Sequence, residues 1–139
     1  MQSFSLPGFL THLGGAIATI ELAQLHAIEK AAKIVEKESK RVLGTHDYDW
    51  PPLAASTIAR KKTGDSPLLE TSEMKESIQH KVVSPHEAHV GSDLDKSVWM
   101  ELGTSRAPAR SFLMQAAVHK EEAVHKAVGD HMHNHLIYP

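Results

Sequence analysis

Apolar and polar positions divide the chain into helix-like and strand-like stretches. From Ala16 to Leu43, apolar residues recur every three or four positions, and Glu and Lys residues occupy the other side. This is the period of an amphipathic helix, and two Glu–Lys pairs spaced i,i+4 favour it further. Gly44 follows directly, as a residue that commonly ends a helix. The pattern therefore predicts one long helix over residues 16–43.

The length of this helix raises the question of what it packs against. It would extend about 42 Å at 1.5 Å per residue, whereas a compact domain of this size has a diameter under about 40 Å. Residues 1–15, which include Phe4, Leu6 and Phe9 but are interrupted by Pro and Gly, predict a short apolar arm or half-helix before it. Two interpretations are open for both segments: packing on the chain's own domain, or contact with a neighbouring subunit.

The middle of the chain alternates turn-rich and short ordered segments. Residues 45–67 predict a long, mobile loop that contains a short helical piece over 54–61. Residues 68–77 predict a helical turn that Thr71 caps. This segment leads directly into the strand-like part of the chain.

Three stretches show the period of two that is typical of strands. They cover residues 78–83, 87–92 and 96–102, and Ser84-Pro85 separates the first two. Short connections predict antiparallel pairing. Ser111 can cap a final helix over 112–128, after which residues 129–139 read as a His-rich tail. We therefore expect a single α+β domain, residues 1–139, with the long N-terminal helix and a C-terminal helix packed on a three- to four-stranded antiparallel sheet.

Composition and charge narrow the possible partners. The net charge of -2 and the pI of about 6.6 argue against the dense basic surface of a duplex-binding protein, although a lumen that lets DNA pass tolerates this charge. The absence of Cys excludes disulfides and thiolate metal sites. No apolar run approaches ~18 residues, and no basic signal segment is visible. We expect a soluble protein without a membrane partner and without a classical export signal.

Histidine is the one residue type here that could bind a metal. His131, His133 and His135 alternate near the C-terminus, and neutral imidazoles favour zinc, nickel or copper. No carboxylate set accompanies them, so a loose tail that binds metal adventitiously is the competing interpretation. No nucleophile elbow, paired-His helix or Gly-rich phosphate loop is present. We expect no cofactor and no enzymatic activity, and keep a His-rich metal-binding or hydrolytic protein as the alternative.

Four residues around a Pro-containing loop are candidates for contact with another subunit. Glu101 and Arg110 flank this loop and invite an ion pair, either within the chain or across a subunit boundary. Arg106 lies in the loop, as a candidate for a partner or a DNA phosphate, and Trp99 is a rare large anchor just before it. The same loop also belongs to a longer series of motifs.

That series resembles the neck, or tail-completion, proteins of long-tailed bacteriophages. The matching segments, over roughly residues 48 to 117, are Trp50-Pro51-Pro52-Leu53 with Thr57 and Lys61, Leu68-Leu69-Glu70-Thr71-Ser72-Glu73-Met74 with Ser77-Ile78, Val90-Gly91-Ser92, Glu101-Leu102-Gly103-Thr104 and Pro108-Ala109-Arg110-Ser111-Phe112-Leu113. The chain departs from the family's usual residues at Thr71-Ser72, Lys96-Ser97 and Ser111. The order and spacing of the segments carry the resemblance, more than any one of them.

The resemblance implies a structural virion protein, in a phage or prophage particle assembled in the bacterial cytoplasm. Such a protein forms a homo-oligomeric ring, with a hexamer as one candidate, and joins the head connector to the tail tube. DNA passes through the lumen of the ring without sequence-specific binding. A host-encoded interaction module of similar fold is a further alternative.

Overall fold

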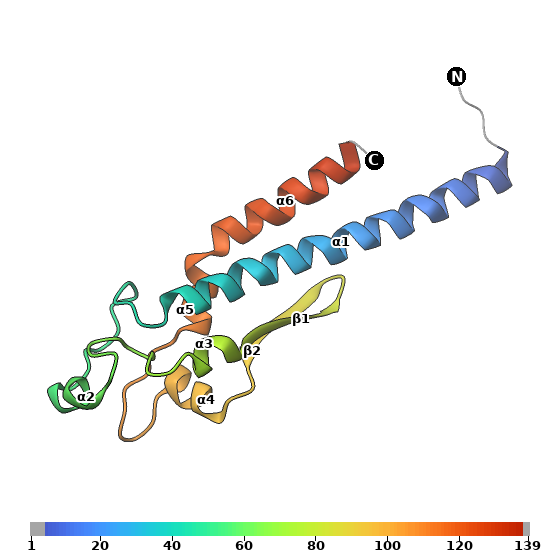
Figure 1. The fold of residues 1–139 in the computed structure, drawn as a ribbon. Helices are drawn as coiled ribbons and strands as arrows, with labels where there is room; N and C mark the ends of the chain where they lie inside the picture. The colour runs from blue at the N-terminus through green and yellow to red at the C-terminus, as the bar shows by residue number, and fades with distance from the viewer. Residues whose placement is uncertain (1–4, 138–139) are drawn as a thin grey trace.

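One helix forms the long axis of the molecule. In the computed structural model, which describes residues 5–137, α1 (Leu6–Val42) runs unbroken for 37 residues (Figure 1). Ser5 caps its start by accepting a hydrogen bond from the Gly8 N–H at 3.3 Å. Pro7 is tolerated in this first turn because no intrahelical N–H is needed there. The predicted start of the long helix at residue 16 is therefore wrong, because residues 6–15 of the expected arm are helical and continuous with it, while residues 1–4 of that arm lie outside the described residues.

The other end of α1 follows the prediction closely. Leu43 is the C-cap, and Gly44 follows with a φ of 86°, a conformation that a side chain disfavours. The Gly44 N–H donates to the Pro67 carbonyl at 2.7 Å, which closes the base of the long loop. Within this loop, α2 (Ala55–Arg60) confirms the predicted short helical piece.

The sheet is smaller than expected. β1 (Ile78–Ser84) and β2 (Glu87–Ser92) cover the first two predicted strands and form the predicted antiparallel pair, with Ile78 opposite Ser92. In the described residues this is a two-stranded sheet, so the prediction of three or four strands is wrong. The fold is nonetheless α+β, mostly helical, with the long N-terminal helix as expected.

The expected third strand is instead α4 (Asp95–Leu102). Asp95 lies in its first turn, where a carboxylate favours the helix dipole. Gly103 ends it with a φ of 78°, and a Cβ built there would lie 2.7 Å from the Ala109 nitrogen. The alternation of Val98, Met100 and Leu102 predicted a strand. The prediction failed because the helix is stabilised by contacts with distant segments, which a local sequence pattern does not show.

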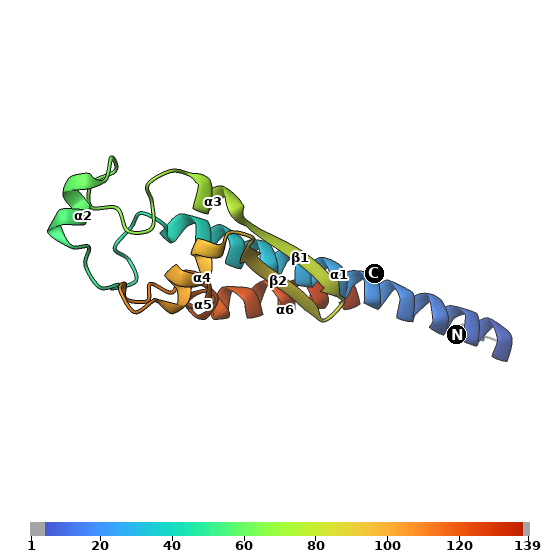
Figure 2. The ribbon, with the colours of Figure 1, turned by 90° about the horizontal axis from the view of Figure 1, so that it is seen from below.

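The C-terminal region is a helix pair. The predicted single helix is broken at Lys120 into α5 (Leu113–His119) and α6 (Glu121–Ile137). α6 lies alongside α1 on the side away from the hairpin, and α1 continues alone beyond both of them (Figures 1 and 2). The expected loose tail is therefore wrong up to Ile137, and residues 138–139 lie outside the described residues. None of the helices within residues 5–137 combines the length and hydrophobicity needed to cross a bilayer.

The core lies at the C-terminal end of α1. Its buried residues come from α1, the following loop, α3 (Glu73–Ser77), β1 and the start of α5, and they are Val42, Leu43, Tyr48, Met74, Ile78, Phe112 and Ala116. Ser72, rather than the predicted Thr71, is the N-cap of α3, and its side chain makes no capping hydrogen bond. The core thus gathers at one end and leaves the first turns of α1 without cover.

A buried carboxylate fixes the loop that leaves α1. Glu38, 5% exposed, accepts hydrogen bonds from Arg41 at 2.8 and 2.9 Å and from the Tyr48 hydroxyl at 2.8 Å. The Tyr48 ring in turn stacks on His119 at a centroid distance of 4.3 Å. Hydrogen bonds from Arg41 and Tyr48 outweigh burial and lower the pKa of Glu38 from 4.5 to about 2.

This pKa predicts an acid-sensitive contribution to stability. Because the unfolded state binds a proton at higher pH than the native state, the contribution is complete above pH 4.5 and is lost as the pH falls towards 2. We expect chemical denaturation to show the unfolding free energy falling over this window by on the order of 2 to 3 kcal/mol. Glu38→Gln should flatten this decline, and Glu70→Gln, at an exposed position, should not. An equal decline in the Glu38→Gln variant would contradict the assignment.

Candidate functional site

The motif segments meet at one end of the molecule, which we call the loop end (residues 45–77 and 93–112). Trp50, from the long loop, donates through its indole Nε1 to the Ser111 carbonyl at 3.3 Å and to Gln115 Oε1 at 3.1 Å. Trp50 also packs edge-on against Tyr48, with ring centroids 5.7 Å apart. Segments about 60 positions apart in the sequence are thereby fixed to each other.

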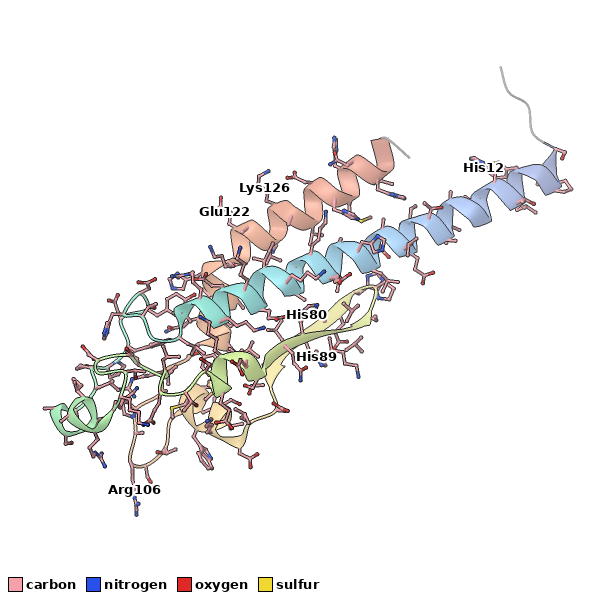
Figure 3. The ribbon with its side chains drawn as sticks, viewed as in Figure 1. His12, His80, His89, Arg106, Glu122 and Lys126 are labelled. Atoms are coloured by element: carbon pink, nitrogen blue, oxygen red, sulfur yellow. The ribbon has the colours of Figure 1, made fainter. Side chains whose placement is uncertain are left out.

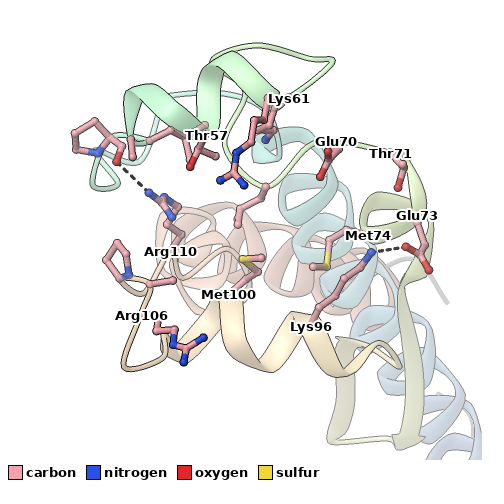
Figure 4. A pocket seen from close by; sticks show the side chains of 17 residues that line it. Thr57, Lys61, Glu70, Thr71, Glu73, Met74, Lys96, Met100, Arg106 and Arg110 are labelled. Atoms are coloured by element: carbon pink, nitrogen blue, oxygen red, sulfur yellow. Dashed lines mark hydrogen bonds and ion pairs between the residues drawn. The ribbon is translucent and has the colours of Figure 1, made fainter.

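Arg110 makes the second link between the same segments. Its guanidinium donates to the Pro51 carbonyl at 2.8 and 3.1 Å and to the Pro52 carbonyl at 3.2 Å. The side chain is only 7% exposed, and these three hydrogen bonds go to neutral carbonyl oxygens (Figure 4). The predicted pairing of Arg110 with Glu101 within the chain is therefore not formed. Arg110 holds the long loop against the loop that precedes α5.

Glu101 makes the third link by capping α5 from a different helix. Its carboxylate accepts the backbone N–H groups of Phe112, Leu113 and Met114, each at 2.9 Å, and the Ser111 hydroxyl at 2.6 Å. These are the donors that the first turn of a helix leaves without intrahelical partners. Ser111 was predicted to cap this helix, but its hydroxyl instead donates to Glu101, whose carboxylate caps α5. We call Trp50, Glu101 and Arg110 the loop lock.

A pocket of about 760 Å³ opens beside the loop lock, between α2, α3 and α4 (Figure 4). Its floor is apolar, with Met74 and Met100. Cations outnumber carboxylates in its lining: the cations are Arg60, Lys61, Lys96, Arg106 and Arg110, and the carboxylates are Glu70 and Glu73. Lys96 pairs with Glu73, and the Lys61 ammonium donates to the Ser66 carbonyl at 2.6 Å. The side chains that line the pocket therefore carry a net positive charge.

Two of the four predicted contact residues are on the outside of the loop end. Trp99 is 57% exposed, next to the exposed Val98 and Leu102 of α4, and Arg106 extends away from the body of the protein (Figure 3). Glu101 and Arg110 instead point inward, as described above. Trp99 and Arg106 are therefore accessible to a partner, whereas Glu101 and Arg110 hold the loop end together.

The histidines of the C-terminal segment lie on α6. His131 is packed against α1, where its Nδ1 lies 3.2 Å from the Lys30 ammonium and its ring contacts His26 edge-on. Burial, then the charge of Lys30, lowers the pKa of His131. Over residues 5–137, no group of three or more His, Cys, Asp or Glu side chains is placed to hold a metal ion. His131, His133 and His135 do not converge on one.

The first turns of α1 carry a row of exposed apolar side chains. Five side chains on one face, each between 43% and 72% exposed, form a stripe: Leu6, Phe9, Leu10, Leu13 and Ile17. Residues 5–20 contain no Lys, Arg, Asp or Glu. We call residues 6–22 the α1 extension. Its apolar residues were visible in the sequence, but its helical continuation past the rest of the fold was not.

Comparison of the chain with protein-family models, curated proteins and solved structures finds no match.

Proposed function

We propose that the protein is a structural subunit of a phage or prophage particle, a neck or tail-completion component that assembles as a ring between head connector and tail tube. It acts by docking and assembly rather than by catalysis. DNA passes through the ring lumen without sequence-specific contacts. The motif resemblance supports the assignment to the neck of a phage particle. The exposed apolar surfaces support assembly through contacts between subunits.

The observation that carries the proposal is the α1 extension. A helix on a protein surface normally presents charged residues to water, yet the extension shows an apolar stripe and no charge before Glu21. Burying five roughly half-exposed apolar side chains contributes on the order of 5 kcal/mol, which is comparable to the cost of bringing two proteins together. One such contact alone is weak, so subunits are expected to remain separate until several contacts form at once.

The opposite end of the molecule offers a second contact surface. Val98, Trp99 and Leu102 of α4 are all more than half exposed, and the loop end lies far from the α1 extension along the molecule (Figures 1 and 2). A subunit within a stack or ring must contact different neighbours through different faces. Two separate apolar surfaces on one small chain support this kind of assembly.

A double substitution tests whether the α1 extension mediates association. Phe9→Gln with Leu13→Gln should keep the fold, because both side chains lie outside the core, and should weaken self-association at least tenfold. Light scattering over a concentration series, with and without connector and tail-tube proteins, measures the effect.

Leu22→Gln is the matched control, since Leu22 is 53% exposed on the other side of the same helix. It should associate as the unsubstituted protein does. If the double variant and the control associated equally, the extension would have no role in assembly, and the proposed function would lose its main support.

A further inference from the structure

A second apolar feature lies on the side of α1. A groove of about 510 Å³ runs between α1, the hairpin and the α5–α6 pair. Its floor is the α1 segment from Ile28 to Val35, and its walls come from β2, α5 and α6. The apolar side chains that line it include Ile28, Val35, Val90, Leu113, Met114 and Val124. Within the described chain, no segment fills it.

The size of the groove suits a small number of large apolar side chains. A cavity of about 150 Å³ accepts one benzene-sized group, so the groove has room for about three. The first two turns of the α1 extension present four apolar side chains on one face, Leu6, Phe9, Leu10 and Leu13. The groove and this face therefore match in chemistry and in volume.

The chain cannot fill its own groove with its own extension. Leu13 and Ile28 belong to the same unbroken helix, and they are separated by about 22 Å along its axis. Even a bend at Gly14 and Gly15 would leave the first two turns, about 12 Å long, short of Ile28, which lies about 20 Å further along the helix. The extension of another copy, by contrast, can reach the groove.

We propose that the first two turns of α1 from one copy dock in the groove of a second copy. This inference rests on the proposed function, because it names the contact through which the ring would form. It joins two different surfaces, the extension of one copy and the groove of the next. Such head-to-tail contacts generate rings when the rotation closes, whereas a two-fold contact stops at a dimer.

Buried area favours this contact over a pair of extensions lying side by side. Two extensions lying side by side, each about 26 Å long and ~10 Å wide, would cover roughly 260 Å² on each partner. The two turns that dock are about 12 Å long, and contact with the groove floor and both walls covers about three faces of this length, roughly 360 Å². Both areas are below the ~800 Å² per partner of a standard interface, so a single contact is weak and assembly needs several of them. A neutral helix end also meets no charge penalty against walls that are mainly apolar.

The absence of Cys from the chain allows a direct test. Leu13→Cys and Ala117→Cys are made as separate full-length proteins, since Ala117 lines the groove and is exposed. The two are mixed under the conditions in which the protein self-associates and treated with a short thiol-specific crosslinker. We expect a crosslinked dimer from the mixture at a yield at least tenfold above that of either protein alone.

Two controls define the faces involved. Thr11→Cys lies on the other side of the extension, and Ala59→Cys lies on α2 at the far end of the molecule (Figure 1). Thr11→Cys mixed with Ala117→Cys, and Leu13→Cys mixed with Ala59→Cys, should give little dimer. Strong crosslinking of Leu13→Cys with itself would show a symmetric pair of extensions and overturn the inference. Rings that form without the Leu13–Ala117 crosslink would also overturn it while leaving the proposed function standing, and the absence of any oligomer would overturn both.

Discussion

Phe112→Ala is expected to unfold the protein or leave it barely stable at 25 °C. Phe112 is fully buried at the junction of α1, β1 and α5, in contact with the core around Val42 and Ile78. Truncating a buried Phe to Ala costs about 3 to 5 kcal/mol, a large part of the ~5 to 15 kcal/mol that holds a domain together. The core around Phe112 contains only seven buried residues within the described chain, so little else is available to compensate.

Met114→Ala is the matched control, because Met114 is 69% exposed two residues further along the same segment. It should change the unfolding free energy by less than about 0.5 kcal/mol. Urea denaturation followed by circular dichroism measures both variants. A Phe112→Ala variant with the stability of the unsubstituted protein would show that the core lies elsewhere.

Glu101→Ala is expected to have the second-largest effect, about 3 kcal/mol, since hydrogen bonds to a charged group are worth ~1.5 to 3 kcal/mol each and water replaces part of the loss. The carboxylate satisfies three backbone N–H groups at the start of α5 and the Ser111 hydroxyl. Its removal leaves the first turn of α5 without a cap and releases the loop before it. Phe112, whose own N–H is one of the four donors, would then lose its fixed position in the core.

Two further variants separate this capping role from simple loss of charge. Glu70→Ala removes an exposed carboxylate at the same end of the molecule and should be nearly neutral. Glu101→Gln keeps one acceptor oxygen but places an NH₂ group towards backbone N–H donors, so it should recover only part of the stability. Full recovery by Gln, or equal effects of the Glu70 and Glu101 substitutions, would rule out the capping role.

The hairpin and the second half of α1 could be predicted because their patterns are local. Ser84-Pro85 marks the turn between two alternating runs, and the burial of alternate side chains along β1 confirms the period of two. Gly44 marks the end of α1, and its positive φ gives the physical reason. In both cases the residues that specify the structure lie next to each other in the sequence.

The start of α1 was predicted at residue 16 rather than Leu6, because Pro and Gly residues do not always interrupt a helix. Pro7 lies in the first turn of α1, where its missing N–H removes no hydrogen bond. Gly14 and Gly15 lie within the helix despite their lower propensity. Composition alone indicated an interrupted segment, whereas the position of Pro7 relative to the Ser5 cap determines the outcome.

The roles of Glu101 and Arg110 could not be read from the sequence because their partners are distant. Arg110 binds carbonyls 58 and 59 positions earlier, and Glu101 binds donors 10 to 13 positions later. In the sequence, an Arg beside a Pro-containing loop suggests an exposed contact residue. In the folded chain, Arg110 is instead covered by the long loop, whose carbonyls it binds. The same long-range links explain why residues 96–102 form a helix: α4 brings the Glu101 carboxylate to the start of α5.

Negative-stain imaging of the purified full-length protein, alone and mixed with connector and tail-tube proteins, tests the central claim most directly. The account predicts ring-shaped particles with rotational symmetry, and their loss in the Phe9→Gln, Leu13→Gln variant but not in Leu22→Gln. Single particles of monomer size in every mixture, at concentrations where light scattering also gives the monomer mass, would contradict it.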